Sequence, residues 1–474
     1  MLHTVEVASL RTGRENRFLM ELSKAMKVTC ISLLGLLVGA ALNESRAEGV
    51  RLREQFQPGQ VLDTVIELEA QGAFLAGDAR EGESDPSPDV RVRTRFDFAD
   101  RVLSVDSEGA PLRLGRWVRE ASLNLQGEEP IPPLKTTIHP EVRLLVVEAG
   151  ERRAITFSPR GPLSRADLEL VQGPTDPLDL AGLLPVGEVG LGDSWKVNDR
   201  AARSLSSYDA LATNALEATL EALDEASAHV RIAGRIGGAV LGGTGTITCE
   251  GTLHFDRSAG RIVSLKLQRQ EAREPGPVEA GLEFQSTLRL TRRPSAEPAP
   301  ELAAGELDDL PDRLPEDWRL LTYTAPDGRF SMLHDRDWHL FNEDDRQTVL
   351  RWVHQGEIVA QANLIAAPKV EPGRHQDVTQ FRDDLRQALG SRFGRFLEAG
   401  EVEGAPAGGF RYRVVAAGRQ GEEPIFWYYY LVAGPDGDQL VAAFTLRESR
   451  VDSFGDQDRR MIGSLEWASA LSNP

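Results

Sequence analysis

The chain has 474 residues, and its 73 Asp and Glu outnumber its 54 Lys and Arg to give a formal net charge of −19. A surface with this excess of negative charge repels nucleic acid and anionic membranes, so we expect neither as a partner. The length suffices for two or three domains, and the surplus carboxylates either keep the protein in solution or attract a cationic partner.

Residues 1–47 are predicted to be a signal peptide. The apolar run 28–42 follows two lysines, and the small residues Ser45 and Ala47 stand where signal peptidase reads the chain. Cleavage after Ala47 would deliver the protein to the periplasm or outside the cell. The run is shorter than the roughly 20 apolar residues of a spanning helix, so we expect no membrane span in the mature chain.

Translation is predicted to begin at Met26, because the first 25 positions carry three glutamates and form an unusual leader for a signal peptide. The alternative is a genuine long leader. Cys30 lies at the start of the apolar run, far from where a lipid-bearing cysteine would stand. Cleavage leaves Cys249 as the only cysteine, so no internal disulfide can form. It also changes the net charge to about −21, since residues 1–47 hold six basic and four acidic side chains.

Residues 48–292 are predicted to form a β-rich domain. Polar and apolar side chains alternate through residues 89–98, which gives a strand one core face and one wet face. A loop at 256–260 predicts a hairpin, and Ser164 with Asp167 suits the capping box of a short helix at 163–171. We expect one large antiparallel sheet, twisted or partly closed. The other predicted strands are 61–68, 142–147, 154–157, 229–236, 245–255, 261–269 and 282–290.

The segment 183–195, with the sequence LLPVGEVGLGDSW, is followed by these paired strands. In this order it resembles a β-rich domain of unknown function that recurs in exported bacterial proteins. The resemblance implies an extracytoplasmic β domain and brings no known chemistry with it.

Residues 293–317, RPSAEPAPELAAGELDDLPDRLPED, are dominated by proline, alanine and acidic residues. This composition predicts an extended or partly ordered linker that cannot build a core. It divides the larger domain from a smaller one at residues 318–470.

The smaller domain is predicted to alternate strands and helices. Asp377 and Gln380 mark the start of a helix at 378–389, whose apolar residues share one face. A last short helix is expected after Ser453. The predicted strands are 330–333, 348–353, 358–366, 410–416, 426–432 and 439–446. The whole chain is therefore predicted to be α+β and mostly β.

Several pieces of this domain occur in a distinctive order: APDGRFSMLHDRDW, QDVTQFRDDLRQAL, EGAPAGGFRY, FWYYYLV and MIGSLEW. By that order the domain resembles the PsbP-like α/β/α sandwich, known from a photosystem II subunit and from exported bacterial proteins. The resemblance covers nearly all of residues 318–467. It implies a module for binding or assembly rather than for catalysis.

Catalytic motifs are missing from the sequence. It contains no Gly-x-Ser-x-Gly elbow, no Ser-x-x-Lys pair and no Gly-Lys of a P-loop. The glycine-rich stretch 234–245 has neither a lysine nor a helix behind it, so we interpret it as a tight hairpin or bulge rather than an anion cradle. We predict no catalytic residue, no cofactor and no metal ligand.

Two groups of residues invite a metal interpretation. His334 and His339 have acidic neighbours, but a zinc site needs at least a third converging ligand. The acidic stretch 436–438 has Arg447 where a calcium loop requires a bidentate glutamate, so we predict a solvated hairpin turn there.

The aromatic run 426–430, FWYYY, is the strongest candidate surface in the sequence. In a strand, Trp427 and Tyr429 share one face while the other three rings share the opposite face. One set could stack on a sugar or grip a peptide. The alternative, which we favour, is that both faces are covered, one by helices and one by a neighbouring domain, because such rings mostly pack in cores.

Three functions fit these observations. The first is an exported, non-catalytic binding or scaffold protein whose small domain docks an unknown protein or small ligand. The second is an extracytoplasmic hydrolase with two carboxylates in a cleft, roughly 5 to 10 Å apart. The third is an envelope protein that self-associates through a sheet edge. The sequence favours the first and leaves the oligomeric state open.

Overall fold

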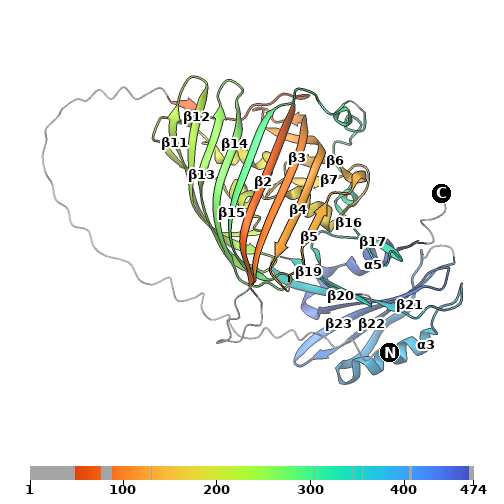
Figure 1. Cartoon of the computed structure of the whole chain (residues 1–474). Coiled ribbons are helices and arrows are strands. Elements are labelled where there is room, and N and C mark those ends of the chain that lie inside the picture. Colours follow the sequence, from red (N-terminus) through yellow and green to blue (C-terminus); the bar gives the residue numbers. More distant parts are fainter. Residues whose placement is uncertain are drawn as a thin grey trace, which may run out of the picture.

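The computed structural model describes residues 49–75, 88–129, 131–303, 305–344, 346–354, 356–404 and 408–468. The predicted signal peptide lies outside these ranges. The described chain is mostly β, with large antiparallel sheets and short helices (Figure 1). Within the described ranges, none of the helices combines the length and the apolar composition that crossing a bilayer requires.

A sheet of twelve strands dominates the first unit. Its order is β10-β11-β12-β13-β14-β15-β2-β3-β4-β6-β7, with β5 paired to β4, and the pairings are antiparallel. Because β2 pairs with β15, the two ends of this unit lie side by side. The strands are β2 Val61–Leu75, β3 Asp89–Val105, β4 Pro111–Gly127, β5 Leu134–Thr137, β6 Leu144–Glu148, β7 Ile155–Phe157, β10 Ser194–Lys196, β11 Ala210–Leu223, β12 Ser227–Val240, β13 Gly243–Asp256, β14 Arg261–Arg273 and β15 Gly281–Pro294.

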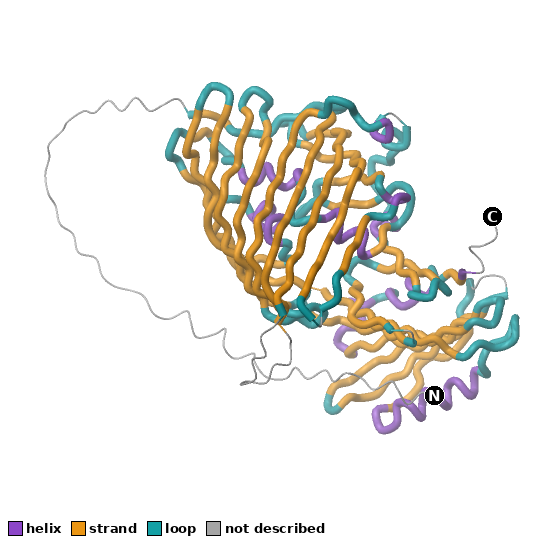
Figure 2. Tube along the Cα trace, in the orientation of Figure 1, coloured by secondary structure: helices purple, strands orange, loops and turns teal. Residues whose placement is uncertain are grey.

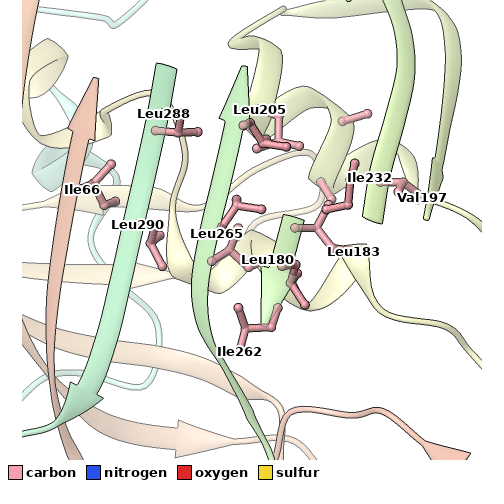
Figure 3. Packing of buried hydrophobic residues seen from close by; sticks show 14 of the residues in the cluster. Ile66, Leu180, Leu183, Val197, Leu205, Ile232, Ile262, Leu265, Leu288 and Leu290 are labelled. Atoms are coloured by element: carbon pink, nitrogen blue, oxygen red, sulfur yellow. The ribbon is translucent and has the colours of Figure 1, made fainter. Parts of the chain in front are cut away.

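One face of this sheet, which we call the inner face, is apolar because every second residue of its strands is aliphatic. The chain between β7 and β11, residues 158–209, packs on it, and we call this stretch the inner segment. Leu180, Leu183 and Leu205 of the inner segment lie among Ile232 and Leu265 of the sheet (Figure 3). The helices of this unit lie behind the strands in Figure 2. Its small elements are β1 Val50–Arg51, η1 Pro140–Val142, β8 Leu163–Ser164, α1 Arg165–Gln172, η2 Pro177–Leu183, β9 Glu188–Val189 and α2 Asp199–Ser206.

Two local predictions in this unit are confirmed. Ser164 caps α1 through the predicted capping box with Asp167. The glycine-rich stretch forms the β12–β13 hairpin, whose turn at Leu241 and Gly242 has positive φ at both residues. A Cβ on Gly238 or Gly245 would come within 2.6 Å of the Tyr208 side chain, so these glycines make room for that ring.

Arg116 on β4 is fully buried and joins the sheet to the inner segment. Its guanidinium donates to both carboxylate oxygens of Asp100 at 2.7 and 2.9 Å and to Asp176 at 2.7 Å. Burial alone would lower the pKa of Arg116, but the two carboxylates raise it above its usual value. Asp176 also caps η2, so a single buried cation holds β3, β4 and the inner segment together.

The second unit contains a seven-stranded antiparallel sheet in the order β18-β19-β20-β24-β23-β22-β21. The helix α3, Val378–Leu389, has the predicted bounds and is capped by Asp377, which accepts from the backbone of Thr379 and Gln380. In Figure 1, α3 lies on the side away from the large sheet, and α5 lies on the opposite side. The other elements are η3 Pro300–Leu302, η4 Glu316–Arg319, β16 Leu321–Thr324, β17 Phe330–His334, β18 Trp338–Glu343, β19 Gln347–His354, β20 Glu357–Ala367, η5 Gly390–Arg392, β21 Phe393–Glu401, β22 Phe410–Gln420, β23 Glu423–Ala433, β24 Gln439–Arg447, η6 Glu448–Arg450, α4 Val451–Phe454, α5 Gln457–Gly463 and β25 Glu466–Trp467.

A small shared sheet joins the two units. Its order is β25-β17-β16-β8, and β8 of the first unit pairs in parallel with β16 of the second. Arginines reinforce this junction by donating to backbone carbonyls. Arg165 donates to the carbonyls of Arg336 and Trp338, and Arg336 donates to those of Thr156 and Arg319. The inner segment therefore forms part of the junction as well as the core.

The predicted linker does contribute to a core, so that expectation is wrong for its leucines. Leu302, Leu307 and Leu314 are buried against a cluster that includes Ala99 and Phe157. The outer face of the sheet is apolar at β3, β6 and β7, and water must be excluded from it. Composition alone did not reveal that the leucines spaced along this segment serve as its cover.

Replacing a side chain of the inner segment by alanine should destabilise the protein only where that side chain is buried. Two positions three residues apart, Leu183 and Val186, provide the comparison. Leu183 is completely buried, whereas the side chain of Val186 is fully exposed. We expect Leu183→Ala to lower the free energy of unfolding by about 2–5 kcal/mol. Val186→Ala should change it by less than about 0.5 kcal/mol. Urea unfolding measures both, and equal effects would contradict the packing described.

The buried Arg116 should contribute far more to the free energy of unfolding than the exposed Arg119 three residues along the same strand. Arg116→Met leaves two carboxylates unpaired in the core, and we expect a loss of about 3–5 kcal/mol in the free energy of unfolding. Arg119→Met, on the same strand, removes only the exposed pairs with Asp63 and Asp97 and should cost no more than about 1 kcal/mol. Equilibrium denaturation of the two variants provides the comparison.

Candidate functional site

The aromatic run 426–430, the candidate surface of the sequence, lies on the interior strand β23, and its last four rings are buried. Trp427 and Tyr429 are 3% and 8% exposed and pack under α3, in a cluster with Phe381. Tyr428 and Tyr430 face α4 and α5. The interpretation that both faces are covered is confirmed, although the covers come from the same unit rather than from a neighbouring domain. These rings therefore hold the seven-stranded sheet and its covering helices together.

The two groups of residues that invited a metal interpretation, His334 with His339 and the stretch 436–438, are both held by contacts within the protein. His334 is buried, and its Nδ1 lies 2.8 Å from the carbonyl oxygen of Asp335. In the part of the chain that the structure describes, no group of three or more His, Cys, Asp or Glu side chains is placed to hold a metal ion. The acidic stretch 436–438 forms the turn between β23 and β24, where Lys369 pairs with Asp438 at 3.0 Å. The predicted hairpin turn is confirmed.

The outer face of the large sheet, opposite the inner segment, carries many charges that the chain pairs internally. Toward the start of β2, Arg95 donates to Asp97 at 2.9 Å and to Glu120 at 3.2 Å. Arg289 reaches Glu69 at 3.3 Å. These exposed pairs contribute little stability, but they satisfy the polar groups on this half of the face.

A row of six polar side chains crosses the other half of the outer face. Strand pairing places Gln71 of β2 beside Arg91 of β3 on one flank and Gln285 of β15 on the other. The same register continues through β14, β13 and β12. All six side chains are exposed. We call this set the polar row: Arg91, Gln71, Gln285, Gln270, Thr248 and Arg235.

The sheet is hollowed along this row. One hollow of about 710 Å³ contains all six residues in its lining, and a second of about 500 Å³ adjoins it. Gln71, Arg91, Gln270 and Gln285 line both. Twisted sheets coil, so a face that is convex in one direction can be concave along another. The polar row thus lies in an open groove rather than on a flat wall.

The polar row differs from the ion-pair half of the face in one respect. Among the described residues, none of its six side chains makes a hydrogen bond or an ion pair with another side chain or with backbone. Each glutamine can offer two donors and an acceptor, and each arginine five donors. The groove therefore presents a continuous set of hydrogen-bonding groups that no described residue occupies.

Strand spacing sets the length of ligand that the polar row could contact. Neighbouring strands lie about 4.8 Å apart, so six strands place the terminal residues about 24 Å from each other. The arginines at the two ends are offset by Asp89 and Glu283 in the same groove. An uncharged, extended chain of hydroxyl or amide groups fits this distribution better than a polyanion or a polycation.

The sequence predicts strands at 261–269 and 282–290, but it does not reveal the polar row. A row exists only through pairing between strands, and Gln71 is far from Gln285 along the chain. The local signal was available, since polar residues alternate with the apolar ones in both strands. The pairing register that aligns these polar residues across the strands could not be obtained from the local sequence.

No protein-family model matches the chain. No curated protein matches it either. A Bacteroides thetaiotaomicron crystal structure is similar at 13% identity and a TM-score of 0.24, over 31% of this chain and about half (47%) of its own length. The Ran-binding protein Mog1p of Saccharomyces cerevisiae has 11% identity and a TM-score of 0.26, over 32% of this chain and 97% of its own. Lipovitellin has 10% identity and a TM-score of 0.28, over 52% of this chain and 27% of its own. Scores this low support no argument about function.

Two histidines at the junction between the units are held neutral. Burial, aided by the charge of Arg165, lowers the pKa of His334 to about 4, against the opposing hydrogen bond to Asp335. Burial and the same arginine also lower the pKa of His339. The folded junction therefore resists protonation at pH values where the unfolded chain accepts it.

Acidification should weaken the fold through His334. Its pKa is about 6.5 in an unfolded chain, so between pH 6.5 and 4 the unfolded state binds a proton that the folded state excludes. We expect this residue to lower the free energy of unfolding by about 2 kcal/mol between pH 7.5 and pH 5. Urea unfolding at both pH values, in the unmodified protein and in His334→Gln, isolates this contribution from those of the carboxylates.

The variant should lose about that much of the pH dependence. His375→Gln, at an exposed ring outside the junction, is the matched control. An unchanged pH dependence in His334→Gln would show that His334 is not held neutral by burial.

Proposed function

We propose that the protein is an exported, non-catalytic binding protein that holds an extended, uncharged polar chain, such as an oligosaccharide, in the groove of the polar row. The single observation that carries this proposal is the alignment across six strands of six exposed hydrogen-bonding side chains that have no partner among the described residues. Glutamine suits such a ligand because a sugar hydroxyl both donates and accepts, as an amide group does.

The rest of the molecule supports a scaffold role for this groove. Beneath the β12 and β13 end of the polar row, Ile236, Ile247 and Cys249 belong to the core against which the inner segment packs, so this end of the row has a firm backing. The signal peptide expected at residues 1–47 would place the groove in the periplasm or outside the cell, where polysaccharides are exposed. The resemblance of residues 318–470 to the PsbP-like sandwich favours a second role for that unit in docking.

The test uses neutral hexasaccharides as probes: cellohexaose, chitohexaose and maltohexaose. We expect at least one to bind with a measurable heat, and the corresponding disaccharide to bind much more weakly because it spans only part of the row. Replacing Gln71, Gln270 and Gln285 together by alanine should weaken binding at least about tenfold, since each lost hydrogen bond contributes about 0.5–1.5 kcal/mol. Isothermal titration calorimetry measures both effects.

The matched control is the double variant Gln55→Ala with Gln387→Ala, at exposed glutamines outside the groove. It should bind as the unmodified protein does. Unchanged affinity in the triple variant, or no binding of any of the three hexasaccharides, would contradict the proposal. Mass spectrometry of the recovered sugar should show an intact hexamer, whereas shortened products would favour the hydrolase alternative.

A further inference from the structure

A separate hollow of about 270 Å³ lies in the second unit. The turn between β16 and β17 forms one wall, and the turn between β18 and β19 forms another. The end of β20, the start of β24 and the strand β25 complete the lining. It is separate from the polar row, although β16, β17 and β25 also belong to the small shared sheet at the junction. Its volume suits a single small molecule.

The floor of this hollow is apolar and aromatic. Phe330 and Trp467 meet edge to face with ring centroids 6.0 Å apart, and both are largely buried. Leu364 and Leu440 continue the floor from the large sheet of this unit. Such a surface favours an aliphatic or aromatic group of a ligand through burial of apolar area.

The rim carries charges of both signs. Arg329 pairs with Asp327 on one turn. On the other turn, Asp344 accepts the backbone N–H groups of Arg346 and Gln347 through its Oδ1 atom alone. The guanidinium of Arg346 has no hydrogen bond or ion pair with any described residue. Among the described residues, one carboxylate oxygen of Asp344 and the guanidinium of Arg346 therefore have no partner at the rim.

We propose that this hollow binds a small zwitterion with an apolar side chain, that is, a free aromatic or aliphatic amino acid. Arg346 would receive the ligand carboxylate in a charge-assisted hydrogen bond, and Asp344 would receive the ammonium group. The ring or alkyl group would lie on Phe330 and Trp467. A purely anionic ligand would face Asp327 and Asp344, and a purely cationic one would face the two arginines, so each would lack half of the complementarity.

The experiment compares four ligands of similar shape by calorimetry on the mature protein. They are L-phenylalanine, the uncharged N-acetyl-L-phenylalaninamide, the anion 3-phenylpropanoate and the cation 2-phenylethylamine. We expect L-phenylalanine to bind with a Kd near 1 mM or tighter. The uncharged analogue should bind at least about tenfold more weakly, because it can make neither charge-assisted bond.

Two conservative variants assign the two charges. Arg346→Gln should weaken the binding of L-phenylalanine and of 3-phenylpropanoate about tenfold or more, and it should leave the affinity for 2-phenylethylamine unchanged. Asp344→Asn, which keeps the oxygen that holds the turn, should have the opposite selectivity. Arg395→Gln, at an exposed arginine of the same unit outside the hollow, is the control and should change nothing. Thermal melting of each variant confirms that the fold is intact.

Three results would overturn the proposal: no saturable heat with L-phenylalanine up to about 10 mM, equal affinity for the uncharged analogue, or unchanged binding in Arg346→Gln. The triple alanine variant of the polar row should bind L-phenylalanine normally. Failure of one site therefore leaves the other untouched.

Discussion

The constraint on which the structure depends is the need to cover the inner face of an open, twelve-stranded sheet. Aliphatic side chains on alternate positions make that face apolar, and water must be kept from it. The chain covers it with its own inner segment, residues 158–209, rather than with a second sheet or a partner. Leu183 and Leu205 lie on the inner face, and the buried Arg116 ties that segment to β3 and β4.

The same inner segment determines how the two units meet. Its strand β8 pairs with β16 and becomes the edge of the small shared sheet, immediately before the helix α1 begins. Arg165, the first residue of that helix, donates to carbonyls of the second unit. Guanidinium groups suit this task because they offer several donors in a planar fork and remain charged when half-buried. The inner segment thus both covers the core of the first unit and attaches the second unit to it.

The outer face of the large sheet has three regions that differ in chemistry. The segment after β15 covers the apolar part with leucines, including Leu302. A second region neutralises itself through ion pairs around Arg95. Among the described residues, the side chains of the polar row have no hydrogen-bonding partner, and the β12 and β13 end of the row lies over the core that the inner segment packs against. A rigid backing beneath exposed polar groups is what a binding surface needs, because little order then has to be gained when the ligand arrives.

The sequence by itself determined the local elements. The alternation at 89–98 predicted β3, Ser164 and Asp377 predicted the starts of α1 and α3, and the glycine-rich stretch predicted a hairpin, because each of these patterns acts over a few residues. Tertiary structure decided the rest. The strand β11 is rich in alanine and leucine, and its sequence alone does not predict a strand. It becomes one because it pairs with β10 and β12. Burial of Leu302 and alignment of the polar row both depend on which distant segments meet, and no local pattern encodes that choice.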